Sequence, residues 1–160
     1  MRSEAGFTMI ELMVIIAIAA ILLALAVPSF TESLARRRLE GVTNELNADL
    51  QFTRTQAVSN NASVSLVTSA HGYTVSGVTT VSSVASPVTV TYKTITLDST
   101  ISLTPSMTVT MDGYRGMSSA ATTITVSDSQ TSATLEVKVD TVGRIQICAP
   151  GVSFGGYVAC

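Results

Sequence analysis

Glu11 is the residue whose chemistry calls most clearly for a partner, because it interrupts a run of apolar side chains. An ionised carboxylate inside a bilayer costs about 3 kcal/mol even on lenient insertion scales, and such a group usually has a function. Residues 3–35 contain no Lys, Arg or His that could neutralise it. Cleavage after Gly6 would give Phe7 a free α-amino group. We therefore expect the amine of one chain to meet the carboxylate of another in an assembly of parallel helices.

Other reactive side chains are scarce. The chain has one histidine, His71, and two cysteines, Cys148 and Cys160. This set is too small for a zinc site with several ligands, so we expect no metal and no cofactor. The sequence shows no nucleophile elbow, phosphate loop or paired-carboxylate motif, and His71 precedes Gly72 in an expected surface turn. We therefore predict no catalytic residues and no enzyme activity.

The composition narrows the function classes further. The chain has 160 residues, of which 46% are hydrophobic and only 12% charged, with a net charge of −2. Globular domains are charged at about a quarter of their positions, so this chain is poor in charge. These values exclude disorder driven by charge and a polybasic coat for nucleic acid.

Residues 7–27 are apolar except for Thr8 and Glu11. As a helix this segment is about 30 Å long, which matches the hydrocarbon core of a bilayer. A cleaved secretory signal is one alternative, since residues 24–26 (Ala-Leu-Ala) form a small-residue cleavage site. A plain single-span anchor is another, but neither alternative explains Glu11.

The string Gly6-Phe7-Thr8-Met9-Ile10-Glu11-Leu12 resembles the class III signal of type IV pilins and type II secretion pseudopilins. In that family a prepilin peptidase cuts after the Gly, N-methylates the new terminal Phe and leaves the Glu fifth in the mature chain. Gly6, Phe7 and Glu11 match these positions one for one. The resemblance implies a leader peptide at 1–6, a transmembrane and filament-core helix at 7–28, and a periplasmic pilin globular domain at 29–160.

The rest of the chain predicts an α+β fold. Helical periodicity continues to about Asn60, and six side chains recur on one face: Leu39, Val42, Leu46, Leu50, Thr53 and Ala57. Ser and Thr are then frequent from 62 to 142, and apolar residues alternate with hydroxyls, which indicates antiparallel strands with one buried face. Such strands are expected at 88–92, 94–97, 108–111, 122–126 and 135–139, with turns at 71–72, 86–87, 112–113, 128–129 and 142–143. The predicted architecture is a long N-terminal helix, with a transmembrane first half, packed on an antiparallel β-sheet.

Cys148 and Cys160 lie at the end of the predicted sheet region. In an oxidising compartment two thiols normally pair, so we expect a disulfide that holds a glycine-rich tail in place. A catalytic dithiol is the alternative, but the C-x-x-C spacing is absent. The cluster at 36–38 (Arg-Arg-Arg) is either solvated or paired with acidic groups of adjacent subunits.

Two late segments, 111–116 and 143–148, resemble the late-strand patterns of the FimU, FimT and GspH group of minor pilins and pseudopilins. This resemblance implies a minor pilin, at or near the filament tip, that helps to initiate and assemble a type IV pilus. Its partners would be other pilins, the prepilin peptidase and, before assembly, the inner membrane with a periplasmic C-terminus. After assembly it would lie in the pilus at the cell surface of a Gram-negative bacterium.

A type II secretion pseudopilin and a FimT-like DNA receptor for natural transformation are the alternative functions. DNA reception in FimT-like pilins is associated with a G-R-x-R motif, of which Gly143 and Arg144 match while Gln146 replaces the second Arg. The other cations of the last third, Arg115 and Lys138, would be the remaining contacts. Three nearby carboxylates offset these charges, so DNA is the less favoured partner. They are Asp112, Glu136 and Asp140.

Overall fold

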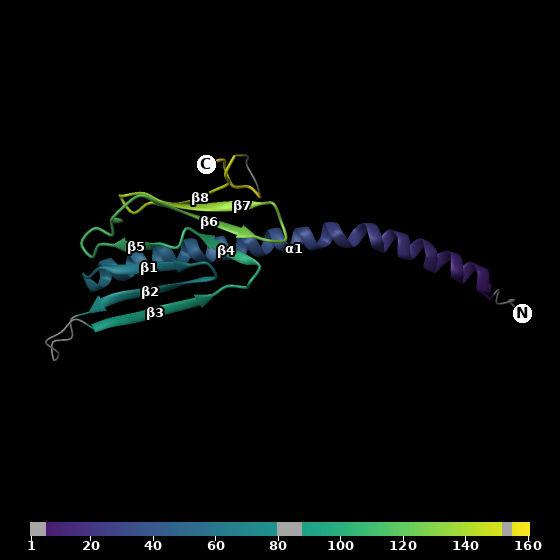
Figure 1. Cartoon of the computed structure of the whole chain (residues 1–160), viewed down its shortest axis with the longest axis horizontal. Coiled ribbons are helices and arrows are strands. Elements are labelled where there is room, and N and C mark those ends of the chain that lie inside the picture. The colour runs from purple at the N-terminus through teal and green to yellow at the C-terminus, as the bar shows by residue number, and fades with distance from the viewer. Residues whose placement is uncertain (1–5, 80–87, 152–154) are drawn as a thin grey trace, which may run out of the picture. The chain divides into compact units, whose positions relative to one another are not determined.

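The computed structural model describes residues 6–79, 88–151 and 155–160, apart from the side chains of 25–29. The chain divides into two compact units, 1–34 and 35–160, and the helix α1 (Met9–Asn60) contributes to both (Figure 1). No helix in the described part of the chain has the combined length and apolar character that a membrane crossing requires. The turn expected at 86–87 lies outside the described residues.

Helix α1 confirms the predicted long helix and its end at Asn60. It begins at Met9 because Thr8 caps it: the backbone N–H of Glu11 donates to the Thr8 hydroxyl at 3.3 Å. It ends because Asn61 adopts a left-handed φ of 49°, a conformation that Asn tolerates better than most residues.

One face of α1 forms the centre of the core of the second unit. The predicted stripe is confirmed, since Val42 is partly buried and the other five members are fully buried. These five are Leu39, Leu46, Leu50, Thr53 and Ala57. The hydroxyl of Thr53 donates to the carbonyl of Asp49 one turn earlier, so burial leaves no polar atom of this side chain unsatisfied. Strand residues from both sheets complete the core.

The strands form two four-stranded antiparallel sheets. The first has the order β3-β2-β1-β5, with β3 at Val88–Thr96, β2 at Gly72–Thr79, β1 at Val64–Ser69 and β5 at Thr108–Met111. The second has the order β4-β6-β7-β8, with β4 at Ile101–Thr104, β6 at Thr122–Asp128, β7 at Thr134–Val139 and β8 at Ile145–Cys148. The α+β class is therefore confirmed, with two sheets in place of the one expected.

Several strands differ from their predicted limits. The runs at 88–92 and 94–97 form one strand, β3, whose pairing with β2 contains a bulge at Val75 and Ser76.

Hydroxyl side chains pair across strands on the outward faces: Ser65 with Thr110 at 2.9 Å in the first sheet, and Ser102 with Ser127 at 2.8 Å in the second. These pairs add hydrogen bonds between strands without adding charge.

A polar network ties α1 to the first sheet. The buried carboxylate of Asp49 accepts a hydrogen bond from the phenol of Tyr73 at 2.7 Å. Lys93 on β3 donates to both oxygens of Asp49, at 2.9 and 2.7 Å, and also reaches Glu45 at 3.3 Å. Burial, followed by the bond to Asp49, raises the pKa of the Tyr73 phenol, and the bond to Asp49 raises the pKa of Lys93.

We expect Tyr73→Phe to lower the free energy of unfolding by about 2 kcal/mol, because a buried carboxylate loses a hydrogen bond. Both pKa values are raised on folding, so the associated stability is present below about pH 10 and is lost as the pH rises through the folded-state values. Urea unfolding of the full chain in detergent, followed from pH 7 to pH 11, tests this. A variant as stable as the wild type at pH 7, with the same alkaline loss, would contradict the role of the phenol.

Arg38 ties α1 to the second sheet. Its guanidinium donates to the hydroxyl of Thr100 at 3.1 Å and lies 3.8 Å from the buried carboxylate of Asp128. Of the three arginines at 36–38, Arg38 therefore contacts residues of the second unit, 35–160, to which it belongs. Arg36 and Arg37 are both exposed.

Candidate functional site

The N-terminal end of α1 carries the residues singled out by the sequence. Gly6 and Phe7 precede the helix, and the Phe7 side chain is 76% exposed. Glu11 lies exposed in the first turn of α1. Among the described residues, no cation of this chain forms an ion pair with Glu11.

The surface around Glu11 is apolar. The large side chains of the following turns are exposed, including Met9, Ile10, Leu12, Met13, Val14, Ile15, Ile16, Ile18, Ile21, Leu22 and Leu23. So long an apolar surface must be covered by lipid or protein, since soluble proteins rarely expose patches of this size. Once it is covered, Glu11 would be a carboxylate in an apolar environment, where a positively charged partner is strongly favoured.

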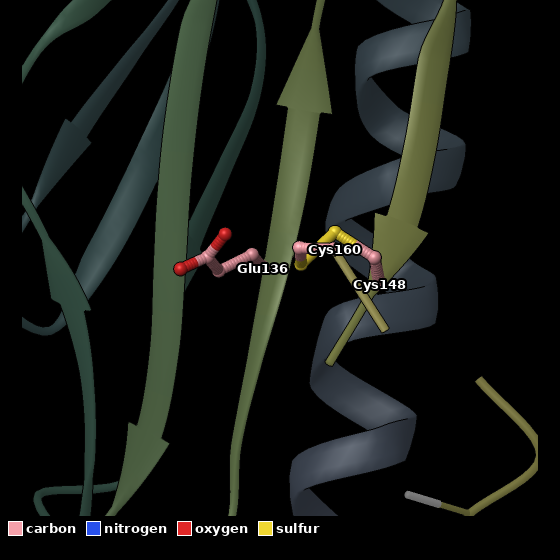
Figure 2. Close-up of side chains that lie close together, drawn as sticks. All are labelled: Glu136, Cys148 and Cys160. Atoms are coloured by element: carbon pink, nitrogen blue, oxygen red, sulfur yellow. A yellow bond between two sulfur atoms is a disulfide. The ribbon is translucent and has the colours of Figure 1, made fainter. Parts of the chain in front are cut away.

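The cysteine pair forms the predicted disulfide. Cys148 ends β8, and its sulfur is bonded to that of Cys160, with Cα atoms 5.1 Å apart. Glu136 on β7 lies opposite Cys148 in the strand register, and its side chain lies near the disulfide (Figure 2). Both thiols are consumed in the bond, so these three residues do not offer the thiolates that a metal site requires.

The disulfide holds the tail against the fold, as expected. The backbone N–H of Ala149 donates to the carbonyl of Val158 at 2.9 Å, and that of Cys160 donates to the carbonyl of Ala149 at 2.9 Å. The amide of Asn44 on α1 donates to the hydroxyl of Tyr157 at 3.0 Å. The tail is thus joined both to the end of β8 and to α1.

The three predicted DNA-contact residues occupy different settings. Arg144 is 68% exposed, and its Nε lies 3.4 Å from the carboxylate of Asp140. Lys138 lies 3.5 Å from Glu136. Both side chains line a hollow of about 270 Å³, together with Ala121, Thr122, Thr123, Val139, Asp140 and Gln146.

Arg115 is exposed in the loop after β5 and does not line that hollow. Asp112 organises this loop, because it accepts hydrogen bonds from the backbone N–H groups of Arg115, Tyr114 and Met117, which lower its pKa. The expected offset of cations by carboxylates therefore exists as ion pairs at Arg144 and Lys138.

Sequence reasoning missed Arg54. This residue of α1 lines a second hollow, of about 330 Å³, together with Gln51, Thr55, Gly143, Arg144 and Ile145. Helical periodicity alone places Arg54 next to the buried Thr53 and gives no reason to single it out. Only the packing of the β7–β8 turn beside α1 brings it to Arg144.

Comparisons with known proteins agree with this arrangement. The family model described as type II transport protein GspH matches residues 42–143, and the model of the prokaryotic N-terminal methylation motif matches residues 1–27. Two proteins of Pseudomonas aeruginosa named fimbrial protein are each 40% identical over 48 residues, which is 30% of this chain. The chain spans 31% of the length of these curated relatives.

The fold also matches a solved structure. The type IV minor pilin FimU of Pseudomonas aeruginosa superposes with a TM-score of 0.56 at 22% identity, over 72% of this chain and 95% of FimU. At this identity the match concerns the fold alone. The family model, however, covers more than half of the chain. The chain therefore belongs to the GspH family within the type IV pilin and pseudopilin superfamily, a family of structural pilins and not of enzymes.

Proposed function

We propose that this chain is a minor pilin that enters a type IV pilus at or near the filament tip and helps to start its assembly. The observation that carries the assembly role is Glu11, which pairs with no cation among the described residues and lies in the first turn of a helix whose apolar side chains are exposed. Such a surface is suited to packing against other helices of the same kind.

Processing comes first in the proposed sequence of events. Prepilin peptidase cuts between Gly6 and Phe7 and methylates the new amine of Phe7. Two features support this step: the match of the methylation motif to residues 1–27, and the exposure of Gly6 and Phe7 ahead of the helix.

Assembly then moves the helix from lipid to protein. Before assembly, segment 7–28 spans the inner membrane, and the periplasmic domain begins at 29. During assembly, the apolar side chains exchange lipid contacts for contacts with neighbouring helices, which changes their burial little. The carboxylate of Glu11 is stabilised most by this transfer, because in lipid it has no partner and in the filament it pairs with the methylated amine of a neighbour's Phe7.

A pseudopilin of type II secretion is the second candidate, and the match to the GspH model favours it. The same processing and the same pairing of Glu11 would serve either assembly. A deletion strain separates the two, because loss of twitching motility indicates a pilus and loss of protein secretion indicates a pseudopilus. DNA reception is less favoured, since Arg144 and Lys138 both pair with carboxylates.

We expect the mature protein to begin with N-methyl-Phe7 and to lack 1–6. Intact-mass and peptide mass spectrometry of protein extracted from membranes and from sheared filaments would detect both changes. A mature terminus at Val27 would instead indicate an ordinary secretory signal and would contradict the proposed function. High abundance in sheared filaments would identify a major subunit in place of a minor one.

A further inference from the structure

The hollow that contains Arg54 joins segments that are far apart in the sequence. Gln51, Arg54 and Thr55 come from α1, whereas Gly143, Arg144 and Ile145 come from the β7–β8 turn and the start of β8. Its volume of about 330 Å³ is enough for one or two side chains of a partner. Two guanidinium groups, one amide and one hydroxyl line it, and none of these lining side chains is acidic.

Two glycines lie close to the side chain of Arg54. A Cβ atom at Gly116 would lie 2.7 Å from Cγ and 2.9 Å from Nε of Arg54, and one at Gly143 would lie 3.2 Å from that Nε. Both glycines have a positive φ, 62° and 78°, so the chain bends around this side chain at two points. The absence of a side chain at both glycines therefore leaves room for Cγ and Nε of Arg54.

The charge of Arg54 is uncompensated in the described part of the chain, where it forms neither an ion pair nor a hydrogen bond. Arg144 uses Nε toward Asp140, at 3.4 Å, and no hydrogen bond between described residues occupies its terminal nitrogens. Two positive charges thus share a hollow with one neighbouring carboxylate. A further carboxylate there would be attracted by both guanidinium groups and could accept paired hydrogen bonds.

Exposed apolar and aromatic side chains lie next to the two glycines or in the same loop as one of them. Val58 adjoins Gly116, since its Cγ2 would lie 3.1 Å from a Cβ there, and Val142 precedes Gly143. Both valines are exposed, and Tyr114 in the same loop as Gly116 is 85% exposed. Exposed Tyr and Arg beside apolar residues are typical of the centre of a protein–protein interface.

We propose that this hollow binds the carboxylate side chain of an Asp or Glu on another pilin subunit, with Arg54 and Arg144 as its two ligands. The proposal rests on the proposed function and identifies a second subunit contact, separate from that of Glu11. A protein partner is favoured over nucleic acid because two exposed valines, Val58 and Val142, lie beside residues of this site, and apolar side chains suit a protein surface better than a phosphate backbone.

The test replaces single arginines in the full chain in its host and measures the amount of this protein in sheared filaments. We expect Arg54→Gln and Arg144→Gln each to reduce it about tenfold, with membrane levels unchanged. The matched control is Arg115→Gln, which removes the exposed cation next to Gly116 that does not line the hollow, and it should have no effect. Wild-type incorporation of both hollow variants would overturn the proposal.

Charge reversal identifies the partner. Arg54→Glu should block incorporation into filaments. Second-site changes that restore incorporation should place Lys or Arg at one acidic residue of another pilin. If restoring changes arise only outside pilins, the proposal is wrong. It is also wrong if Arg54→Gln leaves incorporation intact but weakens the binding of labelled duplex DNA by the full chain in detergent, which would assign the hollow to phosphate. These results remain distinct from failure of the proposed function, in which the wild-type protein itself would be absent from filaments.

Discussion

Glu11→Ala should insert into the membrane at wild-type levels and yet be absent from filaments. Insertion should persist because the substitution makes segment 7–27 more apolar. Incorporation should fail because the amine of a neighbour's Phe7 would enter an apolar helix bundle without its carboxylate. Breaking a buried charge pair by removing one partner costs about 3–5 kcal/mol, which is a reduction of more than a hundredfold.

Immunoblots of membrane and sheared-filament fractions would measure this effect. Glu11→Gln is the matched control, since it keeps the size and hydrogen-bonding capacity of the side chain and removes only the charge, and we expect the same defect. Thr8→Ala removes the helix cap without changing any charge, and it should assemble normally. Wild-type incorporation of Glu11→Ala would refute the pairing of Glu11 with the amine.

Gly143→Ala should be the most destabilising of the small substitutions considered, at about 3 kcal/mol or more. The φ of 78° at Gly143 costs an alanine about 1–2 kcal/mol. The added Cβ would also collide with the carbonyl oxygen of Gly116, a backbone atom that cannot rotate away. Relief of that collision requires the β7–β8 turn to shift away from the loop that contains Gly116, and overpacking of this kind costs about 1–3 kcal/mol more.

Gly151→Ala separates these two costs. Gly151 also has a positive φ, 89°, but nothing within 4 Å of a Cβ there. It should therefore lose only about 1–2 kcal/mol, which is the backbone contribution. Chemical unfolding of both variants as full chains in detergent would test this. Equal losses in the two variants would show that the close approach of Gly143 to Gly116 contributes nothing.

The helix and its buried face could be predicted from the sequence because both follow from local periodicity. The positions from Leu39 to Ala57 repeat every three or four residues, and that spacing alone assigns them to one face. The proposed processing residues, Gly6 and Phe7, could be singled out for a similar reason, since they belong to one continuous string. The disulfide needed only a count of two cysteines and an oxidising compartment.

The pairing of strands could not be predicted in the same way. Alternation at 108–111 shows that Val109 and Met111 face the core, but it does not reveal which strand lies beside them. In the structure β5 pairs with β1, although β4 and β6, its neighbours in the sequence, pair with each other. The division into two sheets is thus a property of long-range contacts.

The hollow at Arg54 shows the same limit for a candidate site. Sequence position associates Arg144 with Arg115 and Lys138, because all three cations lie in the last third of the chain. The structure groups Arg144 with Arg54 as well, which is far away in the sequence. The glycines at 116 and 143 were read as parts of separate motifs, whereas each shapes the surroundings of the same side chain.

The hydroxyl pairs on the two sheets have a consequence for the solution conditions that this protein tolerates. Ser65 with Thr110, and Ser102 with Ser127, are neutral, so dissolved ions do not screen them and they do not titrate in the physiological range. Exposed ion pairs such as that of Lys138 with Glu136 weaken as ionic strength rises. The two sheets should therefore keep these cross-strand contacts in dilute and in concentrated salt alike.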